Sequence, residues 1–268
     1  MKDSMTQEER LFRLVEAFKE DSGEYRDIRT PEGTEERRRI LRSLMNIRMP
    51  RKLPEDVLSV QDAYLAGRAR ERGIVTLADI PVTEEGIGLW QGDITRLAVD
   101  AIVNAANSQM LGCFVPMHTC IDNCIHTFAG VQLRAECARQ MDALRALHGA
   151  DYEQPTAVPM LTDAYNLPAR KVIHIVGPIV EGRLTPRHEA ELDACYRNTL
   201  ELAERSGLHS VAFCCISTGV FRFPAERAAE IAVETVRKWL RGSGSGMKVV
   251  FNVFKDEDLA IYQALLAG

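Results

Sequence analysis

The chain has 268 residues, a formal net charge of −5 and a pI of about 5.8. Hydrophobic residues make up 46% and charged residues 26% of the chain. This balance is typical of a folded domain, so we do not expect a disordered chain. The acidic balance argues against nucleic-acid binding, which needs a basic face, and the lack of about 18 consecutive apolar residues argues against a membrane span.

The first third of the chain is predicted to be helical. Thr6 and Glu9 are spaced as a capping box, and apolar residues at helical spacing follow them. A second helix fits residues 34–47. A third is predicted to begin at Pro54 and to end at Gly73, because proline suits the first turn of a helix and glycine its end.

From about residue 74 to the end, strands are predicted to alternate with helices. The predicted strands cover residues 87–90, 101–104, 171–176, 210–216 and 247–254, and the predicted helices cover residues 122–147, 188–206, 224–240 and 256–266. This order indicates an α/β domain with helices on both faces of a mixed sheet. Ligands in such folds bind at the carboxyl ends of the strands, so the loops that follow the strands are the expected binding site.

Two cysteines and a histidine lie close together in the sequence, directly after the strand that runs into residues 104–107. Cys113, His118 and Cys120 offer three metal ligands, and a site with three protein ligands keeps one position open, as catalytic zinc sites do. Residues 1–21 lack the apolar segment of a secretory signal, so we expect a cytoplasmic protein in which this cluster binds metal rather than forming disulfides. On spacing alone, two buried cysteines and a surface histidine are the alternative.

Three other segments follow predicted strands and carry polar or small residues. Asp93 can accept a hydrogen bond from an exocyclic amine such as that of adenine, or it caps a helix. In residues 104–107, Asn-Ala-Ala-Asn, the small alanines let a ligand approach the backbone and the carboxamides can hydrogen-bond its hydroxyl groups. Alternatively, this segment forms a capped turn. Residues 217–221, Ser-Thr-Gly-Val-Phe, can direct backbone N–H groups at a phosphate, or they are a plain connection.

Together these segments resemble the macrodomain family, over residues 74–268. The resemblance implies a three-layer α/β/α fold with a mixed central sheet that binds ADP-ribose, and several members hydrolyse ADP-ribose from modified proteins. It places Asp93 and Ile94 at the adenine and Asn107 at the distal ribose. It places the diphosphate on the backbone of Ser217, Thr218, Gly219, Val220 and Phe221.

The segment at residues 113–120 departs from ordinary hydrolytic macrodomains, which have a glycine-rich run there. Its Cys-x4-His-x-Cys core is similar to the zinc-dependent branch of bacteria and fungi. Members of that branch carry an N-terminal helical extension, which residues 41–48 and 61–65 resemble. The resemblance therefore implies a helical extension at residues 1–73 and the macrodomain at residues 74–268.

The same branch implies one zinc ion on Cys113, His118 and Cys120, with Cys120, Ile121 and Asp122 against the bound ADP-ribose. We expect zinc to hold a distal-ribose hydroxyl or the attacking water, and Asn107 to orient the ribose. Asp122 acts as general base or orders that water in one interpretation. In the other it is only the N-cap of the helix that follows.

The predicted function is a zinc-dependent, glycosidase-type hydrolase that removes mono-ADP-ribose from modified proteins. Two alternatives use the same pocket: a reader module that binds ADP-ribose without hydrolysis, and a hydrolase of a small ester such as O-acetyl-ADP-ribose. A purely structural zinc is a further alternative, which three ligands disfavour unless a fourth comes from elsewhere in the fold. The resemblance also suggests a lipoyl-carrier protein as the modified substrate, because members of this branch are often encoded beside one.

Overall fold

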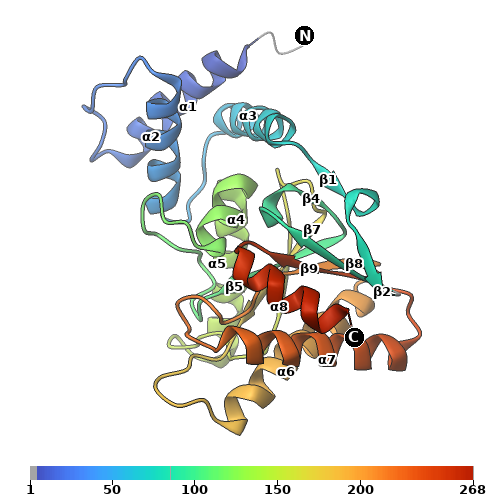
Figure 1. Cartoon of the computed structure of the whole chain (residues 1–268). Helices are drawn as coiled ribbons and strands as arrows, with labels where there is room; N and C mark the ends of the chain where they lie inside the picture. Colours follow the sequence, from blue (N-terminus) through green and yellow to red (C-terminus); the bar gives the residue numbers. More distant parts are fainter. Residues whose placement is uncertain (1–4, 85, 268) are drawn as a thin grey trace.

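A seven-stranded sheet forms the centre of the computed structural model, which describes residues 5–84 and 86–267 (Figure 1). Its strands are β2 (Val82–Glu84), β3 (Ile87–Gln91), β5 (Ala101–Ala106), β6 (Met160–Asp163), β7 (Lys171–Val176), β8 (Ser210–Phe213) and β9 (Lys248–Val253). Their order in the sheet is β2-β3-β9-β8-β5-β7-β6. The inner strands run parallel to one another and the two edge strands run antiparallel to their neighbours. The mixed central sheet predicted from the sequence is confirmed.

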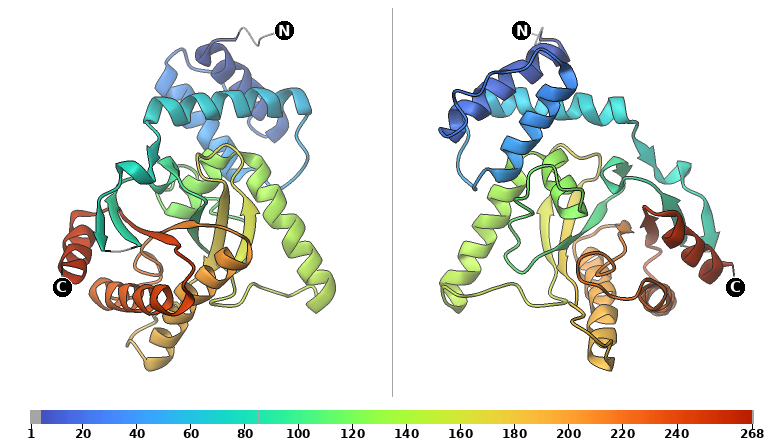
Figure 2. Two further views of the ribbon diagram at one scale, coloured as in Figure 1. Left: turned by 90° about the vertical axis from the view of Figure 1, so that its right-hand side faces the viewer. Right: turned by 60° about the vertical axis from the view of Figure 1, so that its left-hand side comes forward.

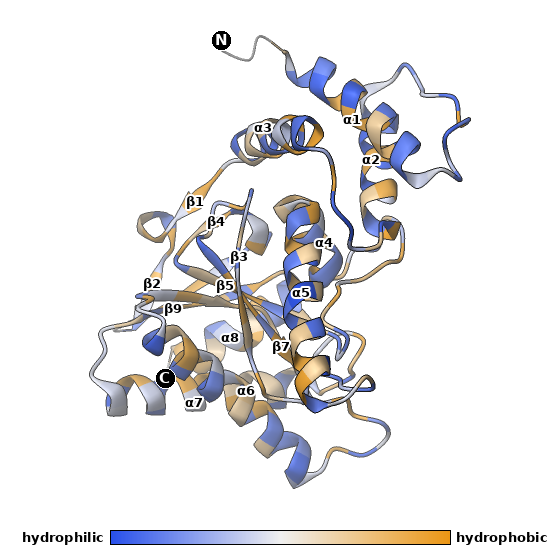
Figure 3. Ribbon diagram, turned by 180° about the vertical axis from the view of Figure 1, so that it is seen from behind, coloured by the Kyte–Doolittle hydropathy of each residue, from blue (hydrophilic) through white to orange (hydrophobic). Residues whose placement is uncertain are grey.

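Helices cover both faces of this sheet (Figure 2). One face is covered by α4 (Ile121–Ala129) and α5 (Val131–His148), and the other by α6 (Pro186–Arg205), α7 (Ala225–Ser243) and α8 (Asp256–Leu266). Strands β7 and β9 are apolar and almost wholly buried, and Figure 3 shows them in hydrophobic colours between helices of mixed colour. Parallel strands buried on both faces have this composition, so the α/β/α layers expected from the sequence are confirmed.

Three helices precede the sheet and share a hydrophobic cluster of their own. They are α1 (Gln7–Ser22), α2 (Thr34–Ile47) and α3 (Glu55–Arg72). Their buried apolar side chains are Leu11, Leu14, Val15, Phe18, Leu41, Leu44, Met45, Leu53, Val60, Tyr64 and Leu65. The capping box at Thr6 and the end of α3 at Gly73 are as predicted. Val131 of α5 also packs on this cluster, so the helices rest on the sheet domain; the boundary between residues 73 and 74 stays a prediction.

The structure differs from the predicted elements in three respects. Gly130, with a φ of 96°, breaks the helix predicted over residues 122–147 into α4 and α5, because side chains disfavour that backbone conformation. Strand β8 ends at Phe213, before the predicted end at Ile216. Strand β6 is absent from the predicted elements, because its four residues are too few to give a periodic pattern. The remaining short elements are β1 (Val75–Thr76), paired with β4 (Leu97–Ala98), and the 3-10 turns η1 (Leu77–Asp79) and η2 (Ile94–Arg96).

Between the parallel neighbours β5 and β8, the connections to the following helices change from one face of the sheet to the other. These strands are hydrogen-bonded neighbours, but β5 leads to α4 on one face and β8 leads to α7 on the other. Such a switch point opens a crevice at the carboxyl ends of the two strands, where α/β proteins bind their ligands. The loops after β5 and β8 are therefore the walls of the expected site. Among the described residues, no helix combines the length and apolar character that crossing a bilayer requires.

Candidate active site

The loop after β5 brings three metal-ligand atoms together. This metal loop (residues 112–120) carries Cys113 and His118, and Cys120 at its end is the N-cap of α4. The Sγ of Cys113 lies 3.6 Å from Nδ1 of His118, and the ligand atoms of Cys113, His118 and Cys120 all lie within 4.8 Å of one another. Zn–S and Zn–N bonds of about 2.3 and 2.0 Å at a tetrahedral angle separate two ligand atoms by about 3.5 Å. The donor set therefore fits zinc with one open position.

Cys124, one turn further along α4, is not part of this group. Its Sγ faces the carbonyl oxygen of Thr119 at 3.9 Å and Nη2 of Arg42 at 3.6 Å. Among the described residues, no other Cys, His, Asp or Glu ligand atom joins the cluster of Cys113, His118 and Cys120. Three protein ligands distinguish an open, catalytic type of zinc site from a closed structural one.

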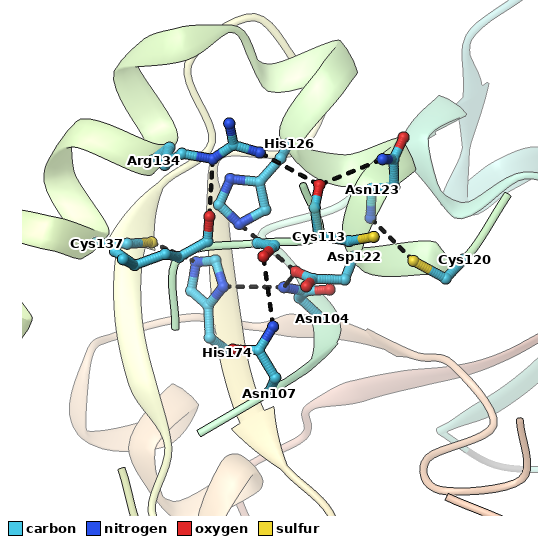
Figure 4. Close-up of polar contacts among 12 residues, drawn as sticks. Asn104, Asn107, Cys113, Cys120, Asp122, Asn123, His126, Arg134, Cys137 and His174 are labelled. Atoms are coloured by element: carbon cyan, nitrogen blue, oxygen red, sulfur yellow. Dashed lines mark hydrogen bonds and ion pairs between the residues drawn. The ribbon is translucent and has the colours of Figure 1, made fainter. Parts of the chain in front are cut away.

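Asn123 fixes the two ends of the metal loop against each other (Figure 4). Its backbone N–H donates to Sγ of Cys120 at 3.4 Å, and its Nδ2 donates to the carbonyl oxygens of Cys113 at 3.3 Å and Val115 at 2.9 Å. Burial raises the pKa of the Cys120 thiol, while the N–H donor favours the thiolate.

Asp122 lies buried in the first turn of α4. Its Oδ1 accepts a hydrogen bond from Nδ2 of Asn104 at 2.8 Å and lies 3.5 Å from Nε2 of His126. Burial raises the pKa of Asp122 to about 6, and the Asn104 hydrogen bond and the positive charge of Arg134 limit the rise. The interpretation of Asp122 as N-cap is wrong, because Cys120 holds that position. A carboxylate with this pKa is suited to accept a proton near neutral pH.

A second group of ligand-type side chains, His126, Cys137 and His174, lies fully buried behind Asp122. Nδ2 of Asn104 donates to Nδ1 of His174 at 3.1 Å, so Nε2 of that ring carries the hydrogen and donates to Thr162 Oγ1 at 3.0 Å. Burial lowers the pKa of His174 to about 3 and that of His126 well below its ordinary value. The two rings are therefore held neutral, and the ring nitrogens of His174 are both hydrogen-bonded.

Asn107 follows the last residue of β5 and forms a turn. Its Oδ1 accepts from the backbone N–H of Gln109 at 3.1 Å. Its Nδ2, drawn with a dashed line in Figure 4, donates to the carbonyl oxygen of Gly112 at 3.4 Å. The capped turn considered for this segment is therefore present. The side chain is half-buried at the entrance of the metal loop, and its contact with the distal ribose stays a prediction.

The loop after β8 carries the residues expected at the diphosphate. Ser217 is buried with a φ of 66°, whereas Gly219 and Val220 are exposed. A Cβ at Gly177, beyond the end of β7, would lie 2.1 Å from Oγ of Ser217, so only glycine permits this close approach. Thr218 Oγ1 donates to the carbonyl oxygen of Cys215 at 3.1 Å. The binding of a diphosphate by this loop stays a prediction.

Asp93, after β3, has a partner that the sequence did not reveal. Its Oδ1 accepts from N and Oγ1 of Thr95 at 3.0 and 2.6 Å, which confirms the capping role considered for it. Its Oδ2 pairs with the guanidinium of Arg72 from α3, which also lies 3.6 Å from the ring centroid of Phe128. Ile94, the other residue expected at adenine, is buried in the core. No local pattern could reveal Arg72, because it comes from a different helix.

The chain is similar to known proteins in sequence and in fold. The model of the Macro domain family matches residues 103–232. A protein-ADP-ribose hydrolase of Treponema medium is 50% identical over 98% of this chain and 100% of its own length. One of Staphylococcus aureus (strain MRSA252) is 41% identical over 95% of this chain and 94% of its own length. The Trypanosoma brucei macrodomain in complex with ADP-ribose superposes with a TM-score of 0.64 at 28% identity, covering 88% of this chain and 97% of that one.

Proposed function

Because the chain belongs to the macrodomain family and is related over nearly its whole length to protein-ADP-ribose hydrolases, we propose that it is a zinc-dependent hydrolase that removes mono-ADP-ribose from modified proteins. The observation that supports this most directly is the open cluster of Cys113, His118 and Cys120 beside the buried carboxyl group of Asp122. A module that only binds ADP-ribose has no need of a three-ligand metal site or of a proton acceptor.

In the proposed mechanism, Cys113, His118 and Cys120 hold zinc, which when bound supplies Lewis-acid polarisation of an oxygen atom. Asp122 takes a proton from the water that attacks the anomeric carbon of the distal ribose, while the bond from that carbon to the acceptor side chain breaks and the acceptor oxygen leaves with the bonding electrons. Asn104 holds the Asp122 carboxylate in one orientation through its 2.8 Å hydrogen bond. The neutral His126 and His174 behind it add no positive charge of their own beside this carboxylate.

The remaining residues are proposed to bind and orient the substrate. Asn107 orients the distal ribose, and the loop from Ser217 to Phe221 binds the diphosphate through its backbone. Cys120 and Ile121 border the ribose, while Asp93 and Ile94 meet the adenine. The loops that carry these residues follow parallel strands β3, β5 and β8, so their positions at one edge of the sheet suit an extended nucleotide.

A chelator experiment tests the proposed function. The protein is incubated with proteins mono-ADP-ribosylated on acidic side chains or on serine, and separately with O-acetyl-ADP-ribose, before and after removal of metal. We expect release of ADP-ribose from at least one protein substrate, loss of that activity without metal, and its return with added zinc. Binding of ADP-ribose with no release from any substrate would instead assign a reader, and release from the small ester alone would assign the esterase.

Arg72 gives a prediction for substrate affinity. In Arg72→Met the carboxylate of Asp93 loses its ion pair and keeps only the hydrogen bonds from Thr95, so we expect the affinity for ADP-ribose to fall about tenfold, the equivalent of one charge-assisted hydrogen bond. Isothermal titration calorimetry measures the change. Arg70→Met, an exposed arginine in the same last turn of α3, is the matched control. Equal affinities of the two variants for ADP-ribose would show that Arg72 does not support the binding of adenine through Asp93.

The substrate protein and the location of the enzyme stay predictions. ADP-ribosylated protein is proposed as the substrate from the names of the relatives, and a lipoyl-carrier protein as the modified partner rests on the family resemblance alone. The incubation with proteins modified on acidic side chains or on serine identifies which kind of side chain carries the ADP-ribose.

A further inference from the structure

Two side chains of α2 hold the backbone of the metal loop next to its histidine. Nη2 of Arg42 donates to the carbonyl oxygen of His118 at 2.7 Å. Oδ1 of Asn46 accepts from the backbone N–H of Met117 at 3.1 Å. These two backbone groups flank the Met117–His118 peptide bond, so α2 satisfies the polar groups on both sides of a proposed zinc ligand.

The conformation at Met117 explains why the loop needs such a support. Its φ of 60° lies in the left-handed region, which is unfavourable for a residue with a side chain. A conformation of this kind persists where the surrounding structure determines it. The hydrogen bond from the N–H of Met117 to Asn46 is a contact of that type, and it comes from a helix about 70 residues earlier in the chain.

Both supporting side chains are themselves fixed. Nδ2 of Asn46 donates to Oγ1 of Thr127 on α4 at 2.9 Å, and Asn46 is almost fully buried. The same Nη2 of Arg42 also donates to Oδ1 of Asn123 at 3.0 Å, and Asn123 is the residue that holds the carbonyl oxygen of Cys113. The contacts of α2 therefore reach both ends of the metal loop.

Arg134 of α5 joins α2 to the other end of the metal loop. Its Nη1 donates to three carbonyl oxygens at the end of α2, those of Met45, Asn46 and Arg48 at 3.1, 2.8 and 2.7 Å. Its Nε donates to the carbonyl oxygen of Leu111 at 2.7 Å and its Nη2 to that of Cys113 at 3.4 Å. The guanidinium of Arg134 thus binds the carboxyl end of α2. It also binds Leu111, which precedes the metal loop, and Cys113, the first proposed ligand in it.

We propose that α2 is a positioning element of the metal centre: Arg42 and Asn46 set its affinity for zinc although neither is a ligand. This inference rests on the proposed zinc site and goes beyond it, because it gives the N-terminal helices a defined role in metal binding. Side chains that orient a ligand from outside the coordination sphere typically change metal affinity 10- to 100-fold when they are removed. Linkage makes the effect reciprocal, so zinc also strengthens the docking of α2.

The test compares the zinc affinity of the full-length metal-free protein and its variants by competition with a chromogenic chelator. We expect Arg42→Met and Asn46→Leu each to weaken zinc binding about 10-fold or more. Arg42→Lys and Asn46→Asp keep a donor to His118 and an acceptor for Met117, and we expect each to recover part of the affinity. Arg39→Met, an exposed arginine one turn earlier on α2, is the matched control and should bind zinc as the wild type does.

Two further measurements separate positioning from a general loss of stability. Thermal unfolding of the metal-free variants gives the temperature below which each is folded, and zinc affinity is compared below it. Because Arg42 is only half-buried, we expect Arg42→Met to remain folded there, so it decides the test even if Asn46→Leu fails to fold. Amide hydrogen exchange of α2 should slow when zinc is added to the wild type. Wild-type zinc affinity in a folded Arg42→Met protein would overturn the inference, whereas no zinc binding by the wild type would overturn the proposed metal site itself.

Discussion

Replacing Asp122 by asparagine is expected to lower the rate of ADP-ribose release by about 10² to 10⁴, the usual contribution of one general base. The amide has nearly the same shape as the carboxylate, and its oxygen can still accept the hydrogen bond from Asn104 that holds Asp122 at 2.8 Å. What it loses is the ability to take a proton. The loss should therefore appear in kcat, with KM and the affinity for ADP-ribose close to those of the wild type.

The control for this variant is Asp142→Asn, which makes the same chemical change on the exposed face of α5. It should keep the wild-type rate. Single-turnover kinetics with a modified protein separate the chemical step from product release in both variants. An Asp122→Asn protein that releases ADP-ribose within about twofold of the wild-type rate would exclude Asp122 as the base.

Removing a metal ligand is expected to abolish activity altogether. Cys113→Ala and His118→Ala each leave two protein ligands, too few to hold zinc against solvent and buffer. We expect the zinc content by elemental analysis to fall from one ion per chain to a small fraction. Release of ADP-ribose should fall to background, while both proteins stay folded because the metal loop lies at the surface of the domain, where residues such as Val115 are exposed.

Cys124→Ala is the informative comparison for the ligand variants. Cys124 lies one turn beyond Cys120, and its sulfur does not join the cluster of ligand atoms, so this variant should keep its full zinc content. Loss of zinc from Cys124→Ala would identify a fourth ligand and a closed, structural site. Hydrolysis by Cys113→Ala that contains no zinc would show that the ion takes no part in the reaction.

Local sequence patterns predicted most of the secondary structure. The capping box at Thr6 and the helix over residues 34–47 were predicted with their correct bounds, because both depend on spacing within a few residues. The prediction of one helix over residues 122–147 was wrong, because the structure has two helices separated at Gly130. Glycine occurs inside helices as well as at breaks, so only the observed φ of 96° distinguishes the two cases.

The sequence by itself determined the composition of the metal cluster and the position of Asp122 two residues after it. A segment of eight residues from Cys113 to Cys120 cannot carry its ligand side chains far apart, so their spacing limits their separation in space. It also determined the α/β class, since the alternation of apolar strands and amphipathic helices leaves few other arrangements.

Only the tertiary structure decided how the cluster is supported and how acidic Asp122 is. The contacts of Arg42 and Asn46 with the metal loop join residues 71 to 76 positions apart, and the pairing of Arg72 with Asp93 joins residues 21 apart on separate elements. The raised pKa of Asp122 comes from the burial of its carboxyl group. These properties depend on which surfaces meet when the helices pack, and no spacing along the chain encodes that.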